Sequence, residues 1–383
     1  MSNKEELHLF ILWENSHSHV EKIVSDICEN FILLNRYEIL WDEDTFSNNM
    51  TRFYGQKLPN NSFKEQECGK GRFTLVTVVD QSPVYADKAT SKGVIFVNRK
   101  MFEAKERYRT WTGGGHKIHS TNSIEESKHD LYLLLDNTYE NYFKKYYTNF
   151  ENHQRIKLDR NIVGAIQWNT MESLFDMLNY HVEYVVLRNF ESLPSNYQSD
   201  IHGDIDILIR GDHQEVAHLL NAQIVYKSES RVHYKINVAN KSIRMDIRFC
   251  GDGYYDTNWE DNILETRVWD NGKFIPNQEN YKYSLLYHAI VHKKTISPDY
   301  ILTLEALDLL KKNFVLELDN FMNNNNYIYS EPYDLSVFFN TLLIKKDVSL
   351  RRKFNIKKAL VKSMIGGAIP EKLKNRVQRF VNK

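Results

Sequence analysis

The chain has 383 residues, of which 42% are hydrophobic and 13% aromatic, enough for the cores of two or three domains. Fifty Lys and Arg residues balance fifty Asp and Glu, so the formal net charge of zero gives no indication of specific nucleic-acid binding. The three cysteines, Cys28, Cys68 and Cys250, are odd in number and lack metal-ligand spacing, which argues against a disulfide framework and favours a reducing cytosol.

No targeting segment or membrane-spanning helix is expected. The N-terminal residues are polar, and the apolar run at residues 7–13 is too short for a signal peptide and lacks a cleavage site. No uninterrupted apolar stretch reaches the roughly 18 residues of a transmembrane helix. We therefore expect a cytoplasmic protein that is, at most, peripheral at the inner face of the membrane.

Residues 1–155 predict a separate N-terminal α/β domain, because strand-like apolar runs alternate with stretches of helical periodicity. The predicted strands are residues 7–13, 37–41, 73–79 and 94–97. The predicted helices are residues 19–31, 100–110 and 127–147. A polar linker at residues 149–160 is predicted to separate this domain from the next.

A glycine-rich loop interrupts this first domain. Its notable residues are Arg109, Gly113, Gly114, Gly115 and Lys117. Consecutive glycines leave backbone N–H groups free for an anion-binding concavity, which Arg109 and Lys117 would flank with positive charge. We interpret the loop as a pocket for a phosphate or nucleotide diphosphate; the alternative is a flexible loop before an ordinary capped helix, with Ser123 and Glu126 in a capping box.

Histidines near this loop suggest a second alternative. His116 and His119, with His129 and Asp130 as partners, could form a zinc site. Histidines that are exposed or hydrogen-bonded are the commoner explanation, because the three glycines favour a loop over the helix that a spacing of three would require.

Residues 156–280 predict a second domain with a helix at 169–180, a strand at 184–188 and a second strand over 204–209. Later in this domain we expect a helix at 213–220, strands at 223–226, 232–238 and 242–249, and a short helix at 259–264. Asp204 and Asp206 alternate with aliphatic residues, so both point to one face of their strand. Asp246 has the same alternating context on a later strand. Like charges on one face repel unless a cation lies between them.

With Gly203 directly before the Asp-Ile-Asp strand and a third carboxylate later, residues 169–252 resemble the nucleotidyltransferase superfamily. The resemblance implies a mixed sheet with flanking helices, in which Asp204, Asp206 and Asp246 bind catalytic Mg²⁺ or Mn²⁺. It also implies that Asp246 completes the shell of one ion or accepts the proton of the attacking hydroxyl. The chain is most similar to the LicD and fukutin-type branch, which passes phosphate-linked groups onto glycans.

One feature of the superfamily is missing. The usual Gly-Ser pair upstream of the two aspartates is absent, and Arg188 stands near its position, which argues against a triphosphate cradle more than against metal binding. Arg188, Arg244 and Arg248 are candidates to balance phosphate charge.

Residues 281–383 predict a helical region with helices at 281–294, 302–314 and 335–343. Its last part, residues 349–383, contains eleven Lys or Arg residues and a single acidic residue, Glu371, interleaved with apolar side chains. A basic amphipathic tail of this kind is typical of an anchor on an anionic membrane surface. A docking helix, an RNA contact and a solvated basic face are the alternatives.

Together these features predict a metal-dependent transferase that moves a sugar or polyol phosphate from a nucleotide-activated donor onto a surface glycan or lipid-linked acceptor. Two alternatives remain open: a nucleotidyltransferase that modifies a protein or RNA, and a non-catalytic binding module. The sequence identifies neither the donor base nor the acceptor. It also leaves open a second activity in residues 1–150.

Overall fold

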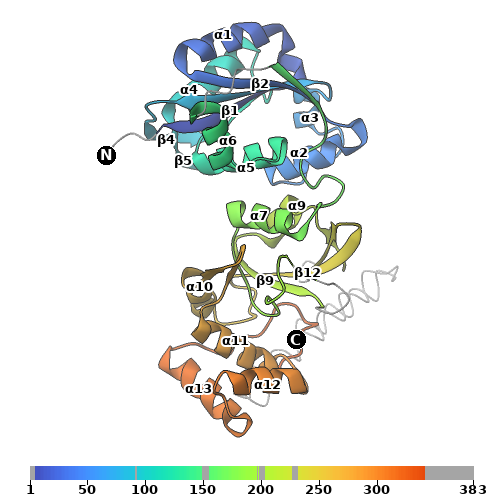
Figure 1. Ribbon diagram of the computed structural model, residues 1–383, viewed down its shortest axis with the longest axis vertical. Coiled ribbons are helices and arrows are strands. Elements are labelled where there is room, and N and C mark those ends of the chain that lie inside the picture. The colour runs from blue at the N-terminus through green and yellow to red at the C-terminus, as the bar shows by residue number, and fades with distance from the viewer. Residues whose placement is uncertain are drawn as a thin grey trace, which may run out of the picture. The chain divides into compact units, whose positions relative to one another are not determined.

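The computed structural model describes residues 5–90, 93–148, 155–195, 197, 203–226 and 232–340. The chain forms two compact units. The first takes in residues 1–182, 214–223 and 235–243, and the second takes in residues 183–213, 224–234 and 244–383. Two mixed five-stranded sheets flanked by helices, followed by a helical C-terminal region, confirm the predicted mixed α/β class without identifying a particular fold family (Figure 1).

The first sheet has the strand order β6-β1-β3-β2-β7. Its strands are β1 (Glu6–Leu12), β2 (Ile32–Leu40), β3 (Phe73–Asp80), β6 (Ile118–Ser120) and β7 (Arg155–Asp159). β1 pairs antiparallel with β3 and β6, whereas β2 pairs antiparallel with β3 and parallel with β7. β1 and β3 are buried along their whole length, which explains their continuous apolar runs.

Several helices and a hairpin of the first unit accompany this sheet. They include α1 (Val20–Asn30), α2 (Phe46–Tyr54), α3 (Phe63–Cys68), α4 (Arg99–Trp111), α5 (Ile124–Leu135), α6 (Tyr139–Phe143) and α7 (Met171–His181), with the hairpin β4 (Tyr85–Thr90) and β5 (Gly93–Asn98). Ile23 of α1 and Tyr108 of α4 share one core with Phe10 and Val76 of the sheet. These two helices therefore pack on the same sheet face.

Two predictions for this unit are wrong. The single helix predicted at residues 127–147 is broken, because Asp136 adopts a left-handed conformation (φ 53°) that ends α5, and Thr138 then caps α6. The predicted linker at residues 149–160 includes strand β7, while residues 149–154 lie outside the described residues. The alternating polar side chains of β7 suit an edge strand, which sequence reading took for a linker.

The second sheet has the strand order β10-β11-β12-β9-β8. Its strands are β8 (Glu183–Val186), β9 (Ile205–Arg210), β10 (Gln223–Ile224), β11 (His233–Val238) and β12 (Lys241–Phe249), and the helix α9 (His213–Leu219) follows β9. β9 runs antiparallel to β8 and parallel to β12. The sheet is therefore mixed, as the sequence predicted.

The C-terminal elements cover part of one face of β8 and β9. They are α10 (Thr257–Glu265), β13 (Val268–Asp270), β14 (Lys273–Ile275), α11 (Gln278–Val291), α12 (Pro298–Ala306) and α13 (Phe314–Asn324). Val185 and Leu208 of the strands share a buried core with Trp259 of α10 and Leu286 of α11. Because Leu208 and Asp206 lie two residues apart on β9, this core adjoins the aspartate-bearing face.

Two helices predicted near the C-terminus differ from the structure. The helix predicted at residues 302–314 is divided into α12, a 3-10 turn (Lys311–Asn313) and α13, with Asp308 left-handed (φ 62°) in between. Residues 335–340 of the helix predicted at 335–343 are not helical, and the basic tail at residues 349–383 lies outside the described residues.

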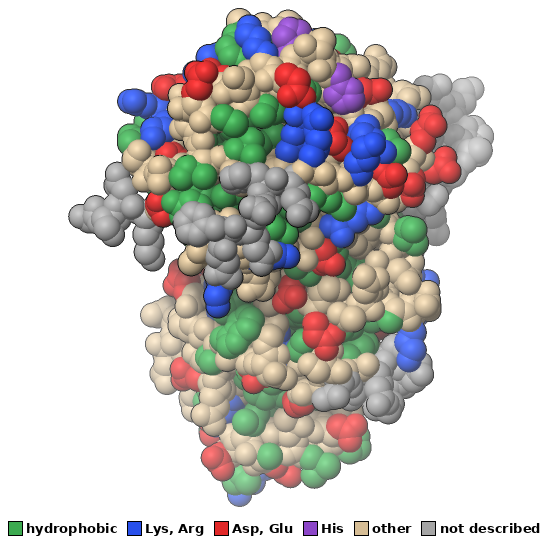
Figure 2. Space-filling view, turned by 45° about the horizontal axis from the view of Figure 1, so that its top comes forward, with side chains coloured by type: hydrophobic (Ala, Val, Ile, Leu, Met, Phe, Trp, Pro, Cys, Tyr) green, Lys and Arg blue, Asp and Glu red, His purple; other side chains and the backbone are tan. Residues whose placement is uncertain are grey.

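Within the described ranges, no helix is both long and apolar enough to cross a membrane. On the face shown in Figure 2, basic and acidic side chains are interspersed, in keeping with the formal net charge of zero. Charge alone therefore marks no binding surface on that face.

Candidate functional site

Two of the predicted aspartates are register partners on neighbouring strands. β12 pairs parallel with β9 so that Asp246 lies opposite Asp206, and both side chains leave the same face of the sheet. Asp206 is 7% exposed and Asp246 is 8% exposed. Asp204, which immediately precedes β9, is half-buried and lines a small hollow together with Asp246. The structure thus brings all three predicted carboxylates to one end of one sheet face.

Asp206 is neutralised by a buried arginine. The Nη2 atom of Arg188 lies 2.7 Å from Oδ1 of Asp206, and Arg188 is only 5% exposed. The same guanidinium donates to the hydroxyl of Tyr254 (3.2 Å), which is hydrogen-bonded to Nδ1 of His288 (2.7 Å). Burial acts to lower the pKa of Arg188, but Asp206 together with the neighbouring Tyr254, Tyr255 and Tyr300 raises it well above its ordinary value. Arg188 therefore serves as a permanent counter-ion in this structure.

Asp246 is less well neutralised. Its Oδ2 lies 3.5 Å from Nε2 of His233 and 3.8 Å from Nη2 of Arg248, and its Oδ1 is buried without a hydrogen-bond partner among the described residues. Burial, together with the negative charges of Asp206 and Asp204 and against the opposing effect of Arg248, raises the pKa of Asp246 to about 7. An uncompensated buried carboxylate of this kind favours a cation nearby.

A second layer of charged groups surrounds the three aspartates. Arg248 lies 3.8 Å from Asp252 and 4.3 Å from the ring centre of Tyr254, and His233 lies 3.5 Å from Asp334. The carboxylates of this cluster belong to Asp204, Asp206, Asp246, Asp252 and Asp334, whereas its buried guanidinium groups belong to Arg188 and Arg248. Negative charge is therefore in excess.

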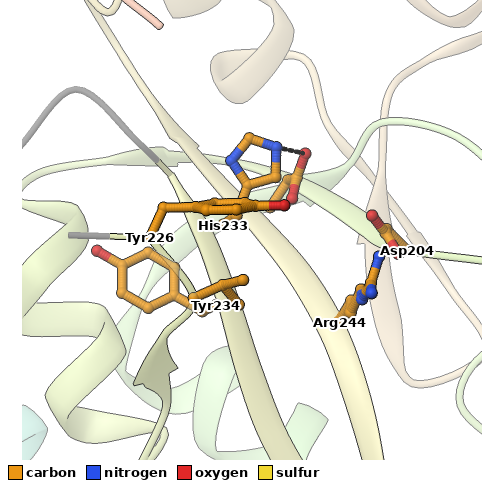
Figure 3. A pocket seen from close by; sticks show the side chains of 7 residues that line it. Asp204, Tyr226, His233, Tyr234 and Arg244 are labelled. Carbon is orange, nitrogen blue, oxygen red and sulfur yellow. Dashed lines mark ion pairs between the residues drawn. The ribbon is translucent and has the colours of Figure 1, made fainter. Parts of the chain in front are cut away.

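The hollow beside the aspartates opens to solvent. It is lined by Asp204, Val225, Tyr226, His233, Tyr234, Arg244 and Asp246. Figure 3 shows His233 joined to the carboxylate of Asp246, with Asp204 and Arg244 on one side of the hollow. Its cavity volume of about 20 Å³ is room for about one water molecule and is far below the roughly 300–1,000 Å³ typical of pockets for drug-sized ligands. A ligand larger than one small group would therefore extend out of the hollow into solvent.

The site residues predicted in the glycine-rich loop belong to the first unit, whereas the aspartates belong to the second. The N–H groups of Gly113 and Gly114 donate to the carbonyls of Thr110 (3.3 Å) and Arg109 (2.7 Å). All three loop glycines have φ between 79° and 85°. The prediction of free amides is therefore wrong for Gly113 and Gly114, because the loop bonds to the C-terminal carbonyls of α4.

The basic residues of the loop are also engaged. The Nζ atom of Lys117 donates to the carbonyl of Thr112 (2.7 Å), and Nε of Arg109 donates to the carbonyl of Ile118 (3.2 Å). Glu67 brings a carboxylate to the loop and accepts a hydrogen bond from the N–H of His116 (3.1 Å). The capping of the next helix is confirmed, since Ser123 accepts from the N–H of Glu126.

Three of the four residues of the alternative zinc site, His119, His129 and Asp130, contact one another. Asp130, which is buried, accepts from His119 (2.7 Å) and from His129 (2.8 Å). Burial acts to raise the pKa of Asp130, but the two imidazoles lower it below its ordinary value. These histidines are hydrogen-bonded, which is the commoner explanation given above.

The predicted metal ligands can be tested against the structure. Among the residues that the structure describes, no three His, Cys, Asp or Glu side chains are arranged so that they could hold a metal ion. The donor chemistry nevertheless fits Mg²⁺ or Mn²⁺, because Asp204, Asp206 and Asp246 supply only oxygen atoms. One buried oxygen of Asp246 also lacks a hydrogen bond to any residue that the structure describes. The carboxylate of Asp206 differs from that of a metal ligand in one respect: it forms an ion pair with Arg188.

Sequence reasoning missed three residues of this site. His233 begins β11, Tyr254 follows the glycine-rich turn after β12, and Asp334 lies in a loop near the end of the described chain. Only His233 carried a signal, since it begins a predicted alternating strand. Tyr254 and Asp334 reach the site through tertiary packing, which no local pattern predicts.

Two further predicted site residues, Gly203 and Arg188, lie next to the aspartates, and Arg188 has been described above. Gly203 directly precedes Asp204 with a left-handed φ of 67°, and a Cβ atom there would meet nothing within 4 Å. The backbone conformation alone therefore explains the glycine.

Comparison of the chain with models of protein families, with curated proteins and with solved structures gives no match.

Proposed function

We propose that this chain is a divalent-metal-dependent transferase that moves a sugar or polyol phosphate from a nucleotide-activated donor onto a glycan or lipid-linked acceptor. The observation that carries the proposal is the pairing of Asp206 with Asp246 on adjacent parallel strands, beside a hollow that Asp204 also lines. The buried Oδ1 of Asp246, which has no hydrogen-bond partner in the described part of the chain, gives independent support. The substrate class rests on the resemblance of residues 169–252 to the LicD and fukutin-type branch.

Each side chain has a defined task in this proposal. Asp204, Asp206 and Asp246 would hold Mg²⁺ or Mn²⁺, and the bound metal would stabilise negative charge on the transferred phosphoryl group. Arg188 orients Asp206 through an ion pair of 2.7 Å, and Arg248 does the same for Asp246 at 3.8 Å. The core formed with α10 and α11 closes the far side of the face, so substrate enters from the hollow.

One observation favours a second candidate, a non-catalytic binding module. A guanidinium already lies 2.7 Å from Asp206, in the place where a cation would otherwise neutralise it. In such a module Arg188 would replace the metal permanently, and the face would retain its geometry without turnover.

The experiment is an activity assay on Asp204→Asn. The purified chain is incubated with Mg²⁺ and CDP- or UDP-linked polyols and sugars, and with free nucleoside triphosphates, and the released nucleotide or pyrophosphate is identified. Because Asp204 is half-buried and forms no ion pair with another described residue, the variant should fold normally. Turnover should fall more than about 100-fold, since even partners of metal ligands contribute 10- to 100-fold.

Asp212→Asn is the matched control, because Asp212 is exposed beyond the opposite end of β9. It should keep wild-type turnover. Release of pyrophosphate from free triphosphates would instead support modification of a protein or RNA. Absence of both turnover and Mn²⁺ binding by calorimetry would refute the transferase proposal and support the binding module.

A further inference from the structure

The three arginines on or near the aspartate face differ in what they contact. Arg188 and Arg248 are buried and each faces a carboxylate. Arg244 is exposed, lines the hollow and forms no ion pair or hydrogen bond with any other residue that the structure describes. Alternation along β12 places it on the same face as Asp246, two residues away. A planar guanidinium held open in this way is suited to a phosphate, which it can contact with two N–H groups at once.

Groups of opposite charge line the hollow. Asp204 and Asp246 attract cations and Arg244 attracts anions, and Figure 3 shows Arg244 on the same side of the hollow as Asp204. A free anion would be repelled by the excess of carboxylates, and a free cation would be repelled by Arg244. A phosphate accompanied by a divalent cation satisfies both kinds of group, which is the form in which nucleotides enter such sites.

An aromatic ring completes the hollow. Tyr226 is 45% exposed, and its ring lies edge-on to His233 with the ring centres 5.6 Å apart. The neighbouring Tyr234 is instead buried, with its hydroxyl 2.7 Å from Nδ1 of His213. Tyr226 thus offers an exposed ring surface in the hollow that Arg244 also lines, and planar bases stack on such surfaces with little sequence preference.

We propose that Arg244 and Tyr226 form the subsite for the nucleoside monophosphate half of the donor. Arg244 binds the phosphate and Tyr226 contacts the base. This assignment rests on the proposed function. It predicts that a nucleoside monophosphate, and not a linear polyol phosphate, is preferred at this position. The hollow is open and its cavity volume is only about 20 Å³, so most of the donor would lie outside it in solvent.

Calorimetric titration of the full chain with cytidine and uridine monophosphate, glycerol 3-phosphate and inorganic phosphate in Mg²⁺ tests the proposal. Arg244→Gln should weaken binding of every phosphate compound about tenfold or more, because it removes a charge-assisted contact. Arg244→Lys should lose less, since it keeps the charge but not the planar fork. Tyr226→Leu should weaken only the nucleotides, by about tenfold.

Lys241→Gln is the matched control, because Lys241 is an exposed cation on the same strand that does not line the hollow. It should bind all four compounds as the wild type does. Wild-type nucleotide affinity in Arg244→Gln, equal weakening of glycerol 3-phosphate and nucleotide in Tyr226→Leu, or no binding by the wild type would each overturn the subsite.

These outcomes are separable from failure of the proposed function. Nucleotide binding that depends on Arg244 and Tyr226 without any turnover would uphold the subsite and refute the transferase. Turnover that requires Asp204 but shows an unchanged KM for the donor in both subsite variants would uphold the transferase and refute the subsite.

Discussion

Asp206→Asn and Asp246→Asn should affect stability in opposite directions, although the two residues lie opposite each other on adjacent strands. Sequence reasoning predicts that Asp206→Asn leaves the fold intact or slightly more stable, because it relieves repulsion between like charges. The structure adds the buried Arg188, which would lose its ion-pair partner. Removal of one member of a buried pair costs about 3–5 kcal/mol. We expect the lower end of this range, since the Asn oxygen can still accept a hydrogen bond from Arg188.

Asp246→Asn removes much less. The ion-pair partners of Asp246 lie 3.5 and 3.8 Å away, and one of its oxygens makes no hydrogen bond among the described residues. Burial and neighbouring carboxylates raise its pKa to about 7, so its ionised form destabilises the fold above that pH. At pH 8 the neutral amide should therefore leave the free energy of unfolding unchanged or raise it by about 1 kcal/mol. This is less than the whole effect of the raised pKa of Asp246, since each pKa unit represents 1.36 kcal/mol.

The assay is urea unfolding at pH 8 in EDTA, followed by tryptophan fluorescence. With a slope of about 1–3 kcal/mol/M, Asp206→Asn should lower the midpoint by about 1 M or more. Asp246→Asn and the control Asp212→Asn should not lower it. Equal losses in Asp206→Asn and Asp246→Asn, or wild-type stability of Asp206→Asn, would refute the assignment of Arg188 as the partner of Asp206.

Three further predictions concern other parts of the chain. Burial, together with Asp252, raises the pKa of Glu260 to about 8, so stability should fall as the pH rises from about 4.5 to 8; Glu260→Gln should flatten this dependence in melting curves. Gly115→Ala should lower the melting temperature more than Gly114→Ala, because both glycines are left-handed but only the Cβ at Gly115 would clash with Glu67; equal losses would contradict this. Deletion of residues 349–383 should abolish low-salt sedimentation with anionic liposomes, since each basic residue contributes about 1 kcal/mol there; unchanged sedimentation would place membrane binding elsewhere.

The elements predicted best are those whose pattern is decided by burial. β1 and β3 are buried throughout, and α7 (Met171–His181), whose N-cap is Thr170, begins two residues after the start predicted at residue 169. The elements that were missed have weak patterns. α2 (Phe46–Tyr54) carries Ser, two Asn and Thr in nine residues, and α3 has only six residues, so neither shows a clear helical period.

The site was predictable only within each strand. Alternation fixed the shared face of Asp204 and Asp206, and it fixed the relation of Asp246 to Arg244 on a second strand. It could not predict the parallel register that places Asp246 opposite Asp206, because register depends on how the chain between β9 and β12 folds. Nor could it assign the arginines, since the difference between a buried counter-ion and an exposed ligand-binding group arises from packing.

The face of β12 shows how one alternating pattern yields three different roles. Arg248 is covered by Tyr254 and neutralises buried carboxylates, and Arg244 reaches the open hollow. Asp246 lies between them, and one of its oxygens has no hydrogen bond among the described residues. Since Asp206 is already balanced by Arg188, the unbalanced charge lies with Asp246 and Asp204, the two carboxylates that line the hollow. A cation brought in with a phosphate would offset that charge while the phosphate meets Arg244. The excess of carboxylates and the arginine that pairs with no described residue thus have one explanation in common, which neither a purely structural ion network nor a simple anion pocket provides.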